Sequence, residues 1–226
     1  KIAETSATIN AKVQALHFIF WDCLLRKGTP AALPILGELQ RISRMFYKEQ
    51  PLITIIVHNT AMHYYLGAGL HGELIAAAKK GLEISEKTGV HIWDMWFYLY
   101  AAVSFVNCMD TKSAEEWLAR VSSMVDGWPN WPNAVYHGQL MRIALIKKEY
   151  AAALHEGKRT LDFVEGTGSL SSLAAIQLML GRLSWIMGKR EEALIYLEQS
   201  NQYAEQKNST WIMTAVLMTN AQFAFD

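Results

Sequence analysis

The chain has 226 residues, with 21 basic and 21 acidic side chains and 51% hydrophobic residues. A disordered chain has fewer apolar residues and a larger net charge, so this composition indicates a folded protein. The balanced charge argues against direct nucleic-acid binding, which usually requires a basic excess.

Apolar residues recur at spacings of three and four along most of the chain, and no segment reads as a strand with a tight hairpin turn. The sequence therefore predicts an all-α protein. The predicted helices, in chain order, are 5–27, 31–48, 52–68, 72–88, 91–108, 112–125, 132–147, 150–165, 170–187, 190–207 and 210–225. The most apolar run, 92–106, contains Asp94 and is shorter than the roughly 20 residues of a membrane span.

A unit of about 40 residues occurs five times along the chain. Each unit has a first helix, a short loop and a second helix with apolar or small residues at i, i+4 and i+7. We call these positions the second-helix column. Its members are Ala32, Leu36, Leu39, Leu74, Ala78, Gly81, Ala114, Leu118, Val121, Ala153, Gly157, Thr160, Ala193, Leu197 and Ser200. Small side chains let two helix backbones approach closely, as a stack of helical hairpins requires.

The predicted architecture is a single domain over 1–226, a right-handed superhelix of about five and a half antiparallel helical hairpins. The hairpins are expected at 5–49, 52–89, 91–126, 132–166 and 170–207, with a half repeat at 210–226. Because both ends look cut, we expect a fragment of a larger protein. The unpaired helix 211–225 would expose apolar surface, which predicts self-association through this C-terminal half repeat.

The unit 174–208 resembles a tetratricopeptide repeat. Leu180 and Gly181 match the small-residue pair of its first helix, and Gly188 matches its loop glycine. Ala193 and Ser200 match the two small positions of its second helix. The other four units match more loosely, and the residues that stand in the place of Gly181 are Phe20, Met62, Ala102 and Met141.

The spacing of the units exceeds the usual tetratricopeptide period, and the longer unit is similar to the repeat domain of MalT-type bacterial transcriptional regulators. The stretch 81–94, GLEISEKTGVHIWD, carries this resemblance to the LuxR-family signal-transduction ATPases. It implies a sensor domain for a small-molecule inducer or a protein segment. The chain has neither a GxxxxGK[ST] loop nor a basic helix suited to a major groove, so ATPase and DNA-binding activities would lie elsewhere in the parent protein.

No motif indicates catalysis, a cofactor or a metal. His58 and His63 are five residues apart, about 140° around a helix, so they cannot share one ion. Cys23 and Cys108 lack the spacing of a zinc site and a basic neighbour that would mark a nucleophile. Free thiols favour a reducing, cytoplasmic compartment. We therefore expect a non-enzymatic protein without cofactors.

The predicted binding surface is a concave groove lined by the first helices of successive hairpins. The expected residues of this groove are Trp21, His63, Trp96, Arg142 and Arg182. Unpaired arginines are costly to bury, so they indicate a solvated groove for an acidic segment or an anionic ligand. Alternatively, the two arginines pair with glutamates of neighbouring hairpins.

The predicted function is a ligand- or partner-binding scaffold that regulates a bacterial transcription factor, in contact with neither membrane nor nucleic acid. The alternative is a general protein–protein interaction adaptor that binds peptides in its concave groove. An all-α enzyme is a weaker alternative, since the sequence shows no pair of titratable groups suited to catalysis.

Overall fold

A computed structural model describes residues 2–46 and 50–225, with side chains for 8–46, 50–125 and 127–224. Every regular element in these ranges is a helix, so the predicted all-α class is confirmed. None of the helices in the described part of the chain combines the length and hydrophobicity that a membrane crossing requires.

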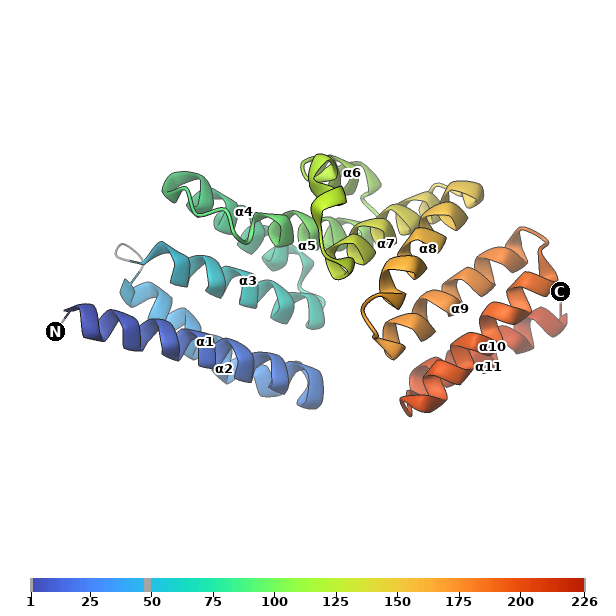
Figure 1. Cartoon of the computed structure of the whole chain (residues 1–226), viewed down its shortest axis with the longest axis horizontal. Coiled ribbons are helices and arrows are strands. Elements are labelled where there is room, and N and C mark those ends of the chain that lie inside the picture. Colours follow the sequence, from blue (N-terminus) through green and yellow to red (C-terminus); the bar gives the residue numbers. More distant parts are fainter. Residues whose placement is uncertain (1, 47–49, 226) are drawn as a thin grey trace. The chain divides into compact units, whose positions relative to one another are not determined.

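The chain forms two compact units, residues 1–121 and 122–226. The first contains three helical hairpins, α1 (Ile2–Lys27) with α2 (Thr29–Phe46), α3 (Pro51–Gly67) with α4 (His71–Thr88), and α5 (Asp94–Asn107) with α6 (Thr111–Ala119). Each helix packs on the next along the chain, and α3 also contacts both α1 and α5 (Figure 1). The first helices of successive hairpins therefore lie side by side, as they do in a helical-repeat stack.

The second unit begins with a 3₁₀ helix (Ser122–Gly127). Two hairpins follow, α7 (Asn130–Ile146) with α8 (Tyr150–Glu165) and α9 (Leu170–Ile186) with α10 (Arg190–Gln206), and α11 (Thr210–Phe225) is a further first helix. In this unit α11 contacts both α9 and α10 (Figure 1). The expected order of five hairpins and a half is thus present across the two units.

Every member of the second-helix column is buried, which confirms the repeat register. The glycines of the column mark the closest helix contacts. A Cβ on Gly81 would overlap the ring of Phe97 in the next first helix. A Cβ on Gly157 would lie 2.7 Å from Cδ2 of Leu180 and 3.0 Å from the sulfur of Met141. These contacts need the absence of a side chain, so the small residues set the spacing between helices.

The five loops within the hairpins share a residue in the left-handed backbone conformation. A residue with positive φ follows each first helix, and these residues are Gly28, Gly69, Met109, Lys148 and Gly188. In four loops the next amide bonds back to a carbonyl of the first helix, as from Glu149 N to Ala144 O at 2.8 Å. This closure is the Schellman arrangement, which glycine favours and other residues adopt at a cost.

The prediction of a helix at 112–125 was wrong at the C-terminal end of that helix. The α-helix stops at Ala119, and Ser122–Gly127 continues as a 3₁₀ helix. The amides of Arg120 and Val121 bond to carbonyls three residues earlier, which tightens the turn. The pair Ser122 and Ser123 favours this break because serine side chains compete for backbone hydrogen bonds.

The packing of α8 yields a prediction with an adjacent control. Ala153 is fully buried whereas Ala152 is exposed, although the two residues are neighbours in one helix. We expect Ala153→Leu to lower the free energy of unfolding by roughly 1–3 kcal/mol, because the added methyl groups have no room. Urea denaturation followed by circular dichroism would measure the change. An Ala152→Leu variant should stay close to wild type, and equal losses in both would contradict the register.

Candidate functional site

Aromatic side chains from three successive first helices meet in the first unit. The rings of Trp21 on α1 and His63 on α3 lie 4.3 Å apart between centroids, and His63 lies 4.5 Å from Tyr100 on α5. Trp96 stacks on Tyr100 at 5.6 Å with an interplanar angle of 26°. We call these four residues the aromatic strip. The contacts of His63 with Trp21 and with Tyr100 join three first helices, so the strip lies on the side of the unit formed by α1, α3 and α5.

The strip includes three of the predicted groove residues, Trp21, His63 and Trp96, and one that sequence reasoning missed. In α5 the position equivalent to Trp21 and His63 is occupied by Val103. Val103 is only 9% exposed and has no ring to contribute to the strip. Tyr100, one turn earlier, takes that place beside His63. The signal for Tyr100 was its i, i+4 spacing from Trp96, since residues four apart share a helix face.

Hydrogen bonds fix two histidines in the strip and beside it. His63 Nδ1–H donates to the carbonyl of Asn59 at 2.8 Å. Thr60 donates its hydroxyl proton to the carbonyl of Ile56, so its oxygen is free to accept from Nδ1–H of His17 at 2.8 Å. The proton of each imidazole therefore sits on Nδ1, and the bond from His17 ties α1 to α3.

Burial makes these histidines neutral. His17 and His63 are each 8% exposed. Burial lowers the pKa of His63 to about 4, against a small opposing effect of its bond to Asn59, and burial also lowers the pKa of His17. Both rings are thus uncharged at neutral pH, and they add apolar and edge-on aromatic contact to the strip rather than charge.

Two polar groups near the strip lack partners among the described residues. Nδ2 of Asn59 and Nε1 of Trp93 are buried without a hydrogen bond. The Trp93 ring packs 6.3 Å from His17. Unpaired buried donors cost about 1–3 kcal/mol each. Other buried atoms in the described chain also lack a partner, such as Nε2 of His137 and Oγ of Ser85, so the groups of Asn59 and Trp93 do not by themselves distinguish the strip.

The two predicted arginines lie in the second unit, one on each of two successive first helices. Arg142 on α7 is half-buried, bonds to Gln139 Oε1 at 3.1 Å, and has a pKa lowered by burial. Arg182 on α9 is exposed, and its Nε donates to Thr219 Oγ1 on α11 at 2.9 Å. Because this bond joins two first helices, Arg182 faces the first-helix side of its unit.

The alternative that Arg182 pairs with a local glutamate is wrong, since it forms no ion pair with any described residue. Its partner is a neutral hydroxyl, and no acidic side chain among the described residues neutralises its charge. An anionic group in contact with this side of the second unit would therefore meet an uncompensated guanidinium.

The contact between a buried histidine and a carboxylate in the second unit is that of His137 on α7 with Glu156 on α8, at 2.7 Å. Burial by itself raises the pKa of Glu156, but the hydrogen bond from His137 and nearby positive charges leave it lowered. His137 is only 2% exposed and stacks on Phe163 with ring centroids 5.5 Å apart. This burial makes the pair a packing feature of α7 and α8. Across the described residues, no group of three or more metal-ligating side chains could hold an ion.

No family model and no curated protein matches the chain. Solved structures match it over most of its length. BtubC (BKLC) from P. vanneervenii has a TM-score of 0.63 at 14% identity, covering 89% of this chain and 90% of that one. The TPR-like repeats of a kinesin light chain from Podospora anserina give 0.62 at 16% identity, covering 88% and 97%. A double mutant of MamA from RS-1 gives 0.54 at 14% identity, covering 88% and 97%. These likenesses show a tetratricopeptide-like fold.

The buried imidazole of His63 makes stability depend on pH. The folded protein holds this pKa near 4, whereas the unfolded chain has about 6.5. Between these values the unfolded chain binds more protons, so stability falls as the pH falls. We expect the His63 contribution to decrease by about 1.5 kcal/mol from pH 6.5 to 5. Urea unfolding at both pH values would measure the loss of stability on acidification. The loss in His63→Phe should be about 1.5 kcal/mol smaller than in wild type.

His155 offers the control, because its side chain is 70% exposed. A His155→Phe variant should keep the pH dependence of the wild type. If His63→Phe also kept it, the buried neutral state of His63 would be disproved.

Proposed function

We propose that this chain is a non-catalytic scaffold that binds a protein or peptide segment along the aromatic strip. The observation that carries the proposal is the contact chain Trp21, His63 and Tyr100, one ring from each of three successive hairpins. Large, rigid aromatic side chains supply most of the energy in many protein interfaces. A surface that uses one residue from each repeat suits an elongated segment better than a compact small molecule.

We further propose that the scaffold is the sensor domain of a bacterial regulator of the MalT type, in the cytoplasm. The long repeat period and the stretch 81–94 support this assignment. Binding would shift the parent between two states through a difference in affinity for each. Sequencing the gene on both sides would test it, since a GxxxxGK[ST] loop should precede the scaffold. Without that loop, the interaction adaptor is the better assignment.

The strip can be tested without knowing the natural partner. Short peptides selected from a random phage library on the whole chain should bind through it. We expect the double variant Trp21→Ala with Trp96→Ala to bind them about 30-fold more weakly, the effect of losing one interface hot spot of about 2 kcal/mol. Fluorescence polarisation with labelled peptides would measure the affinity.

Two exposed tryptophans in the second unit provide matched controls. Trp131 is 43% exposed and Trp211 is 64% exposed, so Trp131→Ala and Trp211→Ala remove the same side chain elsewhere. Both should bind the selected peptides like wild type. Unchanged binding by a folded Trp21→Ala, Trp96→Ala variant would rule out the strip as the contact surface.

We also propose that Arg142 and Arg182 contribute to the binding of acidic segments. The uncompensated charge of Arg182 supports this role. For acidic peptides, Arg142→Gln and Arg182→Gln should each lower the affinity and flatten its dependence on salt, because each removes a charge-assisted contact. The tryptophan variants should instead lower the affinity at an unchanged salt slope. If the arginine variants left the salt slope unchanged, the anionic ligand would be excluded.

Self-association through α11 stays a prediction. Trp211, Leu217 and Met218 on this helix are each at least 64% exposed. Sedimentation velocity should show a dimer in wild type and a monomer in the variant Trp211→Ser with Met218→Ser, because an exposed apolar face drives association. The matched change Met45→Ser on α2, whose methionine is 59% exposed, should leave the dimer intact. A wild type that stays monomeric at high concentration would disprove it.

A further inference from the structure

Each hairpin has a position on its first helix that faces a position on its second helix. The residues at these two facing positions differ from one hairpin to the next. His58, Tyr98 and His137 occupy the same place in the repeat, on the first helices α3, α5 and α7. The facing positions on α4, α6 and α8 are Ala77, Trp117 and Glu156, which follow one another at the same intervals along the chain. The two positions of each pair thus lie on a first helix and on its own second helix.

Two of the three pairs are in contact. The rings of Tyr98 and Trp117 lie 5.6 Å apart, and His137 bonds to Glu156 at 2.7 Å. In the hairpin of α3 and α4, the methyl group of Ala77 has neither a ring nor a hydrogen-bonding atom to offer His58. The imidazole of His58 has no hydrogen-bond partner among the described residues. The internal partner that the other hairpins provide is missing here.

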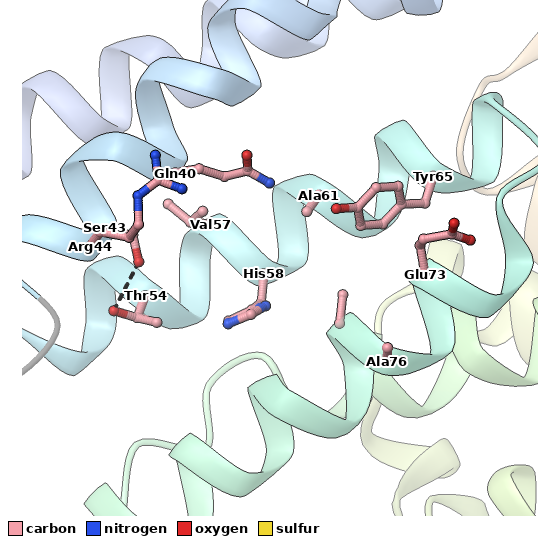
Figure 2. A pocket seen from close by; sticks show the side chains of 11 residues that line it. Gln40, Ser43, Arg44, Thr54, Val57, His58, Ala61, Tyr65, Glu73 and Ala76 are labelled. Carbon is pink, nitrogen blue, oxygen red and sulfur yellow. Dashed lines mark hydrogen bonds between the residues drawn. The ribbon is translucent and has the colours of Figure 1, made fainter.

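A groove of about 680 Å³ occupies this place, between α2, α3 and α4 (Figure 2). The corresponding groove of α4, α5 and α6 is lined by Trp117 and measures only about 350 Å³. The small side chains of Ala76 and Ala77 therefore leave space that a tryptophan reduces in the next hairpin. A volume of several hundred cubic ångströms is the usual size of a ligand-binding site.

The groove carries unlike charges at its two ends. Arg44 on α2 lies at the end marked by Ser43 and Thr54, whose hydroxyls bond at 3.1 Å, and Glu73 on α4 lies beside Tyr65 at the other (Figure 2). Neither Arg44 nor Glu73 forms an ion pair with a described residue. Two charges of opposite sign without a described partner predict a ligand that carries both signs in the reverse order.

The middle of the groove is suited to a hydrogen-bonding group. Burial, and to a smaller extent the charge of Lys80, lowers the pKa of His58, so its ring is neutral at neutral pH and offers one donor and one acceptor. The equivalent His137 bonds to a carboxylate through Nδ1. A carboxylate of a ligand would complete His58 in the same way, within reach of the positive end of the groove.

The distance between these features sets the length of the ligand. His58 and Tyr65 are seven residues apart on α3, a rise of about 10 Å. An extended peptide covers this in about three residues, at about 3.3 Å each. In a free amino acid the two charges are only a few atoms apart, so such a small zwitterion cannot reach both ends.

We propose that this groove binds an extended peptide segment of a partner protein, with an acidic side chain toward His58 and Arg44 and a basic side chain about three residues away toward Glu73. The surface is separate from the aromatic strip, since it is formed by α2 and α4 with one side of α3. The proposal therefore stands or falls independently of the function proposed above.

The test uses the whole chain, labelled with ¹³C at histidine, and two hexapeptides. The probes are Ac-Ala-Glu-Ala-Ala-Lys-Ala-NH₂ and its reversed sequence, and the control peptide replaces both charged residues by Gln. One charged peptide should shift the His58 resonance in a saturable way, and the reversed peptide should bind more weakly. The Gln peptide should bind about tenfold more weakly or not at all, because charge-assisted contacts are lost.

Variants separate the groove from the rest of the surface. Arg44→Glu and Glu73→Lys should each weaken binding about tenfold, and the two together should transfer the preference to the reversed peptide. Arg120→Glu changes an exposed arginine of the neighbouring groove and should bind like wild type. Ala77→Trp copies the residue of the next hairpin and should abolish peptide binding by filling the groove. If this variant does not fold, Arg44→Glu and Glu73→Lys test the proposal without it.

Several outcomes would overturn the proposal. They are the absence of a His58 shift with either charged peptide up to millimolar concentration, equal binding of the Gln peptide, and charge variants that bind like wild type. A His58 shift that appears on raising the protein concentration without peptide would identify a second copy as the occupant instead. Loss of peptide binding in Trp21→Ala with wild-type behaviour of Arg44→Glu would assign the binding to the aromatic strip.

Discussion

The close approach of helices at the second-helix column is the contact on which the rest of the molecule depends. Gly81 leaves room for Phe97, and Gly157 leaves room for Leu180 and Met141. A side chain at either glycine would push two helices apart and lose dispersion contacts over their whole length. The column therefore sets the distance between a second helix and the first helices that flank it. It also explains why the five hairpins repeat one register although few of their residues are identical.

The spacing set by the column allows side chains on the first helices to meet. His63 can contact Trp21 and Tyr100 at once only because α1, α3 and α5 are close neighbours. The same closeness removes water from the imidazoles, which lowers the pKa of His63 and leaves the ring neutral. The first-helix side of the first unit is thus a rigid aromatic surface with little charge. In the second unit this side carries Arg182, which bonds to the hydroxyl of Thr219 and to no acidic side chain that the structure describes.

Function in such a repeat protein comes from the positions where one hairpin departs from the others. The place filled by Tyr98 and Trp117 in one hairpin and by His137 and Glu156 in the next is left open beside His58. Substituting a small residue for a large one costs packing energy unless something else occupies the space. The groove beside His58 is thus a departure from the packing of the next two hairpins, with unlike charges at its ends. The aromatic strip is a second departure, because the positions equivalent to Trp21 and His63 carry Arg142 and Arg182 in the second unit.

The sequence by itself determined the all-α class, the helix order and the register of the column, because these follow from the spacing of apolar residues along one helix. It also placed Trp21, His63 and Trp96 on one side of the first helices. Only the tertiary structure decided which residues meet, and the cases sequence reasoning missed were Tyr100 beside His63, Thr219 beside Arg182 and the groove beside Ala77. Local periodicity describes a single helix, whereas each of these features depends on the side chain that a different helix brings to the same place.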